Sequence, residues 1–560
     1  MAIINKSSSP RPQRSAGFEP VAPATTEEEV ETPSVMELCH EDENDDHPQQ
    51  HLEISTSQCL SKVPRLWRYD HKPPEATALA LDISARAMIL MSSIFLGPAL
   101  LELATAAAEE NCVAPREEAC RIYGFLPSSL LSNIAVVAGF LGSAAMPVFG
   151  ATVDHTSYRW QMGAGSAMGL VLVKGVEVMV SAQTWFLVAC LQVVSIVLFH
   201  MHVTTTYAYT SELSTDAAEQ TAYNTYYVVV LYLFSLLFLA FVTTASFLLN
   251  VDDVGTARIG QVTTSSCCAI IFYVAWKYFF QPSPAKSSIP QHQTLWTVGF
   301  YKVFHTFSRI KRELPALKWL MFAVMFGEAA TNTLITISTT YMKTFLEMPA
   351  NSIGLVMLAV LVMGGPGSKW GGFLSYAIGP VYSAALCNAF LILITTVAAL
   401  TLTGPQHSHY MPLIGGLWGL GLGWLLPMHS TAFMTIIPPR GQEAEHMGLY
   451  ILSGQILSWL PPMVFTAMNE AGMDMAYGLA SLDIFFALAI LCLLMVNNSI
   501  RNNDQKELLD TSDREVTIGF GAVDDPQQFT EMKEIIGAED LSQTLPRRRS
   551  SGRLNIPTLT

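Results

Sequence analysis

The stretch YNTYYVVVLYLFSLLFLAFVTTASFLL, residues 223–249, carries no charged side chain in 27 consecutive positions. About 20 apolar residues in an α-helix are enough to cross the hydrocarbon core of a bilayer. A soluble helix of this length would need a charged or strongly polar face, which this stretch lacks. We therefore predict that residues 223–249 form a transmembrane helix.

Eleven further stretches of similar character lie on either side of it. Only 14% of all residues are charged, against roughly 25% in soluble domains, and 51% are hydrophobic. The sequence therefore predicts an all-α polytopic membrane protein with twelve spans and the lipid bilayer as a partner. The other spans are predicted at 78–106, 128–151, 161–181, 184–206, 259–280, 316–341, 351–375, 378–402, 411–436, 446–468 and 476–497.

The longest polar stretch between the spans, residues 281–315, divides them six and six. We therefore expect two six-helix halves, residues 76–280 and 316–497, joined by a basic linker. The tails, residues 1–75 and 498–560, are polar and acidic, and such composition is typical of disordered segments.

The basic residues outside the spans gather on one side of the membrane in this arrangement. Loops rich in Lys and Arg stay in the cytoplasm, and the linker shares its side of the membrane with both tails and with Arg159, Lys369 and Arg440. This predicts cytoplasmic termini and linker. The net charge of −15 comes mostly from the tails, and we expect no nucleic-acid partner. Cys112 and Cys120 share one loop on the opposite side, where an oxidising lumen would permit a disulfide; the sequence leaves this pairing open.

No enzyme signature is present. The chain has no GxxxxGK[ST] phosphate loop, no CxxC pair, no HExxH and no GxSxG, which are motifs with known catalytic or metal chemistry. We expect no catalytic residue, no cofactor and no bound metal.

Ionisable residues inside the spans are the candidate functional groups, because such residues are costly in a membrane and commonly face a partner or a pathway. Glu102 and Glu328 are predicted to bind a coupling proton or a substrate ammonium group, while Asn332 and His429 orient the solute. The alternative for each carboxylate is a protonated, inert side chain. Lys174 and Glu177 stand three positions apart in the third span, and their opposite charges are expected to neutralise each other.

A candidate gate follows the second span in GATVDHTSYRW, residues 150–160. Gly150, Asp154 and Arg159 fit the pattern G-x3-D-x4-[RK] of major facilitator proteins, in which glycine permits close helix contact and the two charges form a cytoplasmic latch. His155 replaces the usual basic residue. The equivalent turn of the second half, GGPGSKWGG, keeps Lys369 but lacks the acid. The expected fold is therefore the twelve-helix major facilitator fold.

The segment IPPRGQEAEHMGLYILSGQILSWLPP, residues 437–462, resembles a conserved segment of the autophagy-related vacuole effluxer family, a branch of the major facilitator superfamily. Glu443 and Glu445 begin the eleventh helix and are assigned to the gate, the alternative being stabilisation of the helix N-terminus. The matching residues are Pro438, Gly441, Glu443, Ala444, Glu445, Gly448, Leu449, Tyr450, Gly454, Ser458 and Pro461.

The resemblance implies secondary active efflux of amino acids or similar small polar solutes from a vacuole or lysosome-like compartment to the cytoplasm. A proton is the expected coupling partner, and a vacuolar membrane is favoured over the plasma membrane. Two alternatives stay open. One is a major facilitator transporter of a sugar, ion or drug, and the other is a membrane sensor or scaffold that transports nothing.

Overall fold

The computed structural model describes residues 73–521, except 111, 113–119, 211, 215–216, 283, 286–287, 290–293 and 438–442. The predicted tail 1–75 lies outside this part apart from its last three residues. The described residues are almost entirely helical, with one isolated β-bridge between Ile122 and Phe125. The predicted all-α membrane fold is confirmed.

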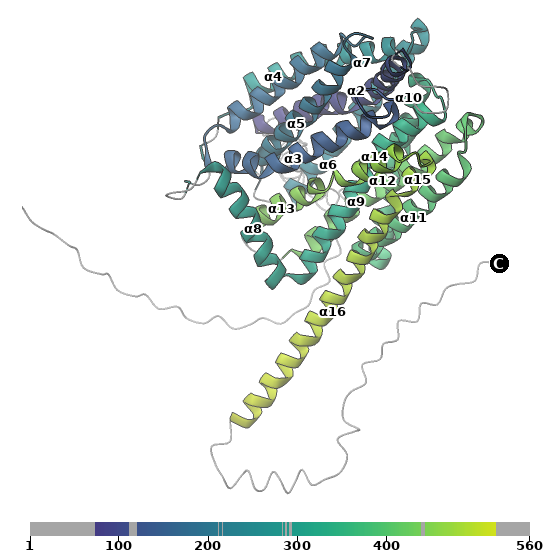
Figure 1. The fold of residues 1–560 in the computed structure, drawn as a ribbon. Helices are drawn as coiled ribbons and strands as arrows, with labels where there is room; N and C mark the ends of the chain where they lie inside the picture. The colour runs from purple at the N-terminus through teal and green to yellow at the C-terminus, as the bar shows by residue number, and fades with distance from the viewer. Residues whose placement is uncertain are drawn as a thin grey trace, which may run out of the picture. The chain divides into compact units, whose positions relative to one another are not determined.

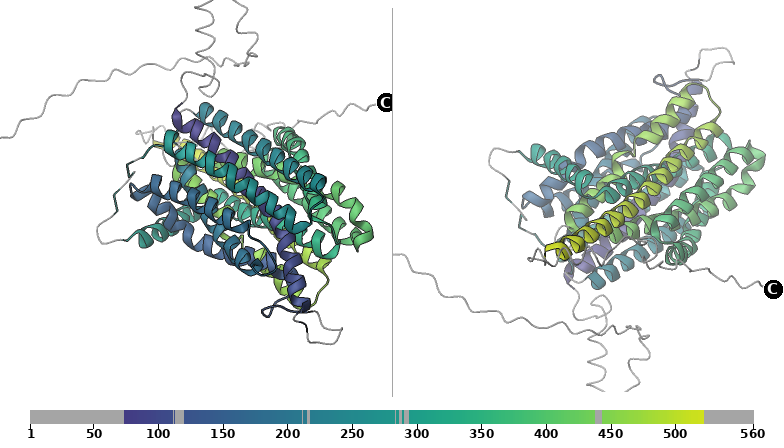
Figure 2. Two further views of the ribbon diagram at one scale, coloured as in Figure 1. Left: turned by 90° about the horizontal axis from the view of Figure 1, so that it is seen from above. Right: turned by 90° about the horizontal axis from the view of Figure 1, so that it is seen from below.

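The long helices run side by side (Figures 1 and 2). Helices α2 to α7 pack chiefly against one another, as do α9 to α16, which gives the two expected bundles. The first bundle contains α2 (Pro74–Glu110), α3 (Leu130–His155), α4 (Arg159–Glu177), α5 (Trp185–Thr210), α6 (Ala217–Leu249) and α7 (Asp253–Val274). The second contains α9 (Pro315–Thr340), α10 (Ala350–Ile378), α11 (Pro380–Thr401), α12 (Met411–Ile436), α13 (Glu443–Ile456), α14 (Leu460–Glu470), α15 (Met475–Ala480) and α16 (Leu482–Gly521).

Eleven helical segments of the described chain are long and apolar enough to cross a membrane. The predicted third span, 161–181, is the one that does not meet this measure. It corresponds to α4, whose apolar character is reduced by Lys174 and Glu177. These two residues are nevertheless fully buried and form an ion pair at 2.8 Å, as predicted. Because α4 packs against α5 and α7 inside the first bundle, we count it with the other eleven as one of the twelve long helices of the fold.

Glycines allow α10 and α12 to pack with their backbones in contact. A Cβ atom on Gly367, Gly419 or Gly423 would overlap a backbone carbonyl of the facing helix. The glycine-rich segments 364–372 and 415–423 thus serve helix packing.

Two segments differ from the predicted domain limits. The linker contains a helix, α8 (Leu295–Glu313), whose start is capped by Thr294 and which packs against α3 and α9. Helix α16 continues to Gly521, past the ends of its neighbours (Figure 1). The first part of the tail predicted to be disordered, residues 498–521, is therefore helical.

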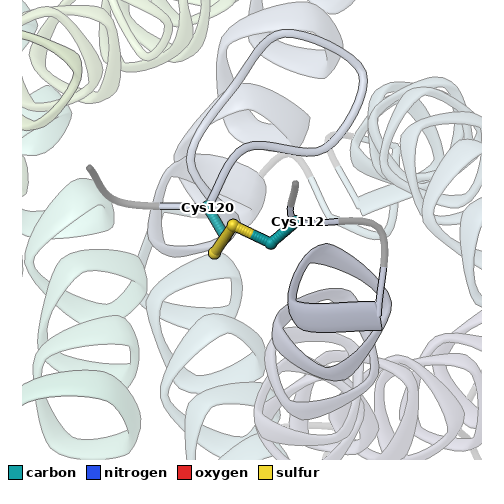
Figure 3. The surroundings of a disulfide bond; sticks show 2 residues. All are labelled: Cys112 and Cys120. Atoms are coloured by element: carbon teal, nitrogen blue, oxygen red, sulfur yellow. A yellow bond between two sulfur atoms is a disulfide. The ribbon is translucent and has the colours of Figure 1, made fainter. Parts of the chain in front are cut away.

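The two ends of the bundle carry different features. The linker end is where α8 crosses the molecule, and the disulfide end carries the loop between α2 and α3. Cys112 and Cys120 form a disulfide in that loop (Figure 3). The pairing that the sequence left open is thus present.

Candidate functional site

The carboxylate of Glu328 lies against the backbone of Gly454, which joins α9 to α13. A Cβ atom at position 454 would overlap Glu328 Oε2. Only glycine leaves room for a carboxylate at this place, and Gly454 belongs to the segment 437–462 singled out from the sequence. The side chain of Glu328 is 17% exposed, so it is largely enclosed but still accessible.

His429 of α12 is the second predicted residue at this site. Its Nδ1 atom lies 4.0 Å from Glu328 Oε1, and its side chain is fully buried. Neither ring nitrogen of His429 has a hydrogen-bond partner among the described residues, and the same holds for Oδ1 of the buried Asn388 on α11. Buried polar atoms without partners are rare in proteins and call for an explanation. A bound solute or water would supply the missing partners.

The chain breaks its helix beside this cluster. Residues 457–459 separate α13 from α14, and the following Pro461 and Pro462 lack the backbone N–H that a continuous helix would use. Helix α13 packs against α3 of the first half, where the Ser143 hydroxyl donates a hydrogen bond to the carbonyl of Gln455, the residue after Gly454. The cluster Glu328, His429, Asn388 and Gly454 therefore borders the first half.

Two other predicted residues stand apart from this cluster. Asn332 is exposed, one turn from Glu328 on α9, and makes no hydrogen bond with a described residue. Glu102 lies at the disulfide end, where it forms an ion pair with Lys343 at 2.8 Å. The structure therefore brings Glu328 and His429 together and places Glu102 elsewhere.

Lys343 ties the two halves together at the disulfide end. It lies in a π-helical turn, η6 (Tyr341–Phe345), that extends α9, and it also forms an ion pair with Asp253 of α7 at 2.5 Å. Asp253 Oδ1 accepts a hydrogen bond from the backbone N–H of Ala350 at the start of α10, where a carboxylate is favoured by the helix dipole. One buried aspartate of the first half thus binds the second half twice.

Further contacts close the same end. Arg121 forms an ion pair with Glu470 at 2.6 Å, and Asn469 donates hydrogen bonds to Ser128 and Ser129. Deeper in the interface, the hydroxyls of Ser132 and Thr466 lie 2.7 Å apart. All these pairs join α2–α3 loop or α3 residues to α14, so the halves are held together at the disulfide end.

We predict that Lys343→Met loosens this closure. The change leaves Asp253 and Glu102 without their cation, and loss of about 1–2 kcal/mol raises the population of the opened state roughly five- to thirty-fold. Ser132→Cys, buried in the closed state, reports the opening through its rate of labelling by a membrane-impermeant maleimide. Lys302→Met at the linker end is the control. Equal labelling in both variants would show that Lys343 does not hold this end.

The predicted gate residues at the linker end have partners other than those expected. Asp154 pairs with Lys302 of α8 at 2.9 Å, and Arg159 pairs with Glu212 at 2.8 Å. The expected Asp154–Arg159 latch is therefore wrong for this structure. The reason is that Lys302 belongs to the helix α8, which pairs it with Asp154, whereas the sequence predicted only a basic linker there.

The remaining gate residues give a mixed result. A Cβ atom on Gly150 would meet nothing within 4 Å, so this glycine does not mediate a close contact; Gly299 of α8, which approaches the Pro147 carbonyl, does. Lys369 is exposed and makes no ion pair with a described residue. Helix α13 begins at Glu443 as predicted, but the side chains of Glu443 and Glu445 lie outside the described part.

A charged cluster in the first half was not predicted from the sequence. Asp82 and Arg86 of α2 form an ion pair at 2.8 Å, and Asp82 also contacts His202 of α5 at 2.7 Å. Asp82 and Arg86 stand four positions apart inside the first span, and that spacing was a usable signal. Lys343 was missed because it lies at the very end of its span.

The model of one protein family matches residues 209–506, and its description is vacuole effluxer Atg22 like. This chain belongs to the Atg22-like vacuole effluxer family. The matched residues include Glu328, His429 and Gly454. No curated protein matches the chain.

Several solved structures of transporters are similar in fold to this member of the vacuole effluxer family. The nucleoside transporter NupG is similar with a TM-score of 0.55 at 11% identity, covering 75% of this chain and 99% of its own. The peptide transporter POT in complex with sulfate gives 0.51 at 12%, covering 80% and 98%. The human organic anion transporter MFSD10 gives 0.50 at 14%, covering 76% and 100%. The protein has the major facilitator fold, and family and fold together indicate a membrane transporter.

Proposed function

We propose that the protein is a secondary active transporter that exports amino acids or similar small polar solutes from a vacuole or lysosome-like compartment to the cytoplasm. The observation that carries this proposal is the cluster around Glu328, in which both ring nitrogens of His429 and the Oδ1 atom of Asn388 are buried without partners among the described residues. Membership of the vacuole effluxer family supports the substrate class and the compartment.

The proposed mechanism is alternating access. Residues 76–280 and 316–497 act as two halves that rock about a site near their interface, as in other transporters built from two bundles. The disulfide end is closed by Lys343 and Glu470. Opening that end requires these contacts to break, and the linker end then closes through the helix start at Glu443.

Orientation follows from two features. Basic residues collect at the linker end, which the positive-inside rule places in the cytoplasm. The Cys112–Cys120 disulfide at the other end suits an oxidising compartment. We therefore propose cytoplasmic termini and a lumenal disulfide end, so the closure seen here is lumenal.

Glu328 is the proposed site of coupling. A carboxylate beside a buried histidine can lose its proton when a cationic group enters and regain it when that group leaves. The proton and the cationic group exclude each other because one carboxylate neutralises only one positive charge. Such exchange would link solute movement to proton movement.

The proposal is tested with purified protein in liposomes loaded with labelled leucine, glucose or phosphate, at two pH values. We expect exchange of the amino acid that depends on pH, and no protein-dependent flux of the other two. Flux of glucose or phosphate alone would refute the substrate class. Flux of none of them, with function in cells lost on deletion of residues 1–70 and not on Glu328→Gln, would favour a sensor or scaffold.

A further inference from the structure

The guanidinium of Arg86 is held along one edge by buried residues of the first half. Its Nε atom faces Asp82 Oδ2 at 2.8 Å. Asp82 is fully buried and is fixed in turn by His202 Nε2 at 2.7 Å, while His202 Nδ1 lies 2.9 Å from the Ser166 hydroxyl of α4. Three helices thus determine where the guanidinium points.

The other edge of the guanidinium is available. The two terminal nitrogens of Arg86 make no hydrogen bond with a described residue. Nε is buried, but the terminal nitrogens are not among the buried atoms that lack a partner, so they are accessible. The side chain is 13% exposed. A planar fork with one fixed edge and one accessible edge is suited to bidentate binding of a carboxylate.

Arg86 lies on the face of α2 that meets the second half further along the helix. Between Asp82 and Leu101, only Arg86, Leu90 and Ser93 are not buried. These three residues share one helix face with Gly97, because they stand four, seven and eleven positions along the chain. Gly97 faces Leu131 of α3 and Thr339 of α9.

Glu328 occupies the matching place on α9. The positions 328, 332, 335 and 339 repeat the spacing 86, 90, 93 and 97, so Glu328 lies on the face of α9 that carries Thr339. Arg86 and Glu328 each precede the Gly97–Thr339 contact by eleven residues, which is roughly 16 Å of helix in both cases. Both helices run from the linker end to the disulfide end. The two side chains of opposite charge are therefore at the same depth on facing halves.

We infer that Arg86 binds the carboxylate of a zwitterionic solute whose ammonium group is bound by Glu328. The inference deepens the proposed function and rests on it for the ammonium half. Asp82 and His202 are positioning residues, since they orient Arg86 and do not touch the solute. A solute with both charges connects the two halves through one molecule, whereas a neutral sugar does not.

A purely structural role for Arg86 makes a different prediction. If the arginine only neutralised Asp82, a lysine would serve nearly as well, because it keeps the charge and can reach the same carboxylate. A lysine cannot offer two parallel N–H donors to a second carboxylate. Arg86→Lys therefore separates the two roles, and it avoids the uncompensated buried charge that Arg86→Gln would leave on Asp82.

The test measures binding of three probes to the full chain in nanodiscs. They are L-leucine, its decarboxylated amine 3-methylbutylamine and its deaminated acid 4-methylpentanoate. We expect Arg86→Lys to weaken leucine and the acid by about ten- to hundredfold and the amine by less than about twofold. Glu328→Gln is expected to weaken leucine and the amine but not the acid. Arg258→Lys, whose guanidinium binds only the Val180 carbonyl among the described residues, is the matched control and is expected to change none of them.

The outcomes distinguish this inference from the proposed function. Equal weakening of acid and amine by Arg86→Lys, or no binding of the acid to the wild type, would overturn the assignment of Arg86 even if leucine is transported. Binding of the acid that depends on Arg86, in a protein that does not transport leucine, would support the assignment of Arg86 and refute the proposed function.

Discussion

Glu328→Gln is expected to abolish pH-dependent amino-acid flux in reconstituted vesicles while leaving expression and folding intact. Glutamine keeps the size of the side chain and its place against Gly454, but it can neither carry a proton nor pair with an ammonium group. The expected loss is about a hundredfold or more, as for removal of a group that transfers a proton.

Asp483→Asn is the control for this change. Asp483 also lies in a membrane helix, where it accepts a hydrogen bond from Thr396 at 2.8 Å, and it is not part of the cluster around His429. We expect it to retain transport. If Glu328→Gln transports at the wild-type rate with an unchanged pH profile, Glu328 has no part in the mechanism.

Gly454→Ala is expected to remove transport without reducing stability. A Cβ atom at position 454 displaces the Glu328 carboxylate, and displacement of a functional group by about 1 Å can cost a hundredfold in rate. The flexible end of Glu328 can move aside at little cost to folding, and alanine favours a helix interior over glycine by about 0.5–1 kcal/mol. Flux and thermal melting in detergent, measured on the same preparation, test both parts.

Gly448→Ala provides the matched control in the same helix. A Cβ atom there would meet nothing within 4 Å, so the substitution makes the same change of residue type without touching the site. We expect wild-type flux. Loss of flux in both variants would point to a general need for glycine in α13 and away from the Glu328 contact.

Much of the fold could be predicted because lipid imposes a simple rule on each span. Predicted and observed spans agree closely at 411–436 and 184–206, where mostly apolar residues without Asp, Glu, Lys or Arg fix the helix. The rule fails for segments outside the hydrocarbon core. Nothing in the average polarity of residues 281–315 distinguishes a loop from α8, whose apolar face is buried against α3 and α9.

The site could be predicted only in part. Glu328 and His429 were found because ionisable groups are rare inside spans, and the structure brings them together. Partners from distant parts of the chain, such as Gly454 for Glu328 or Lys302 for Asp154, depend on how helices meet. A single sequence holds no record of those contacts. The charge pattern alone placed Glu102 at the site, whereas Lys343 holds it at the disulfide end.

Alternation of the two halves about this site is tested most directly by distances between spin labels. One pair of labels replaces the exposed residues Tyr123 and Met473 at the disulfide end, and a second replaces the exposed Tyr158 and Tyr376 at the linker end. On addition of a transported amino acid, we predict that a population appears in which the first distance is longer and the second is shorter. Both distances remaining unchanged, or both changing in the same direction, would contradict alternating access.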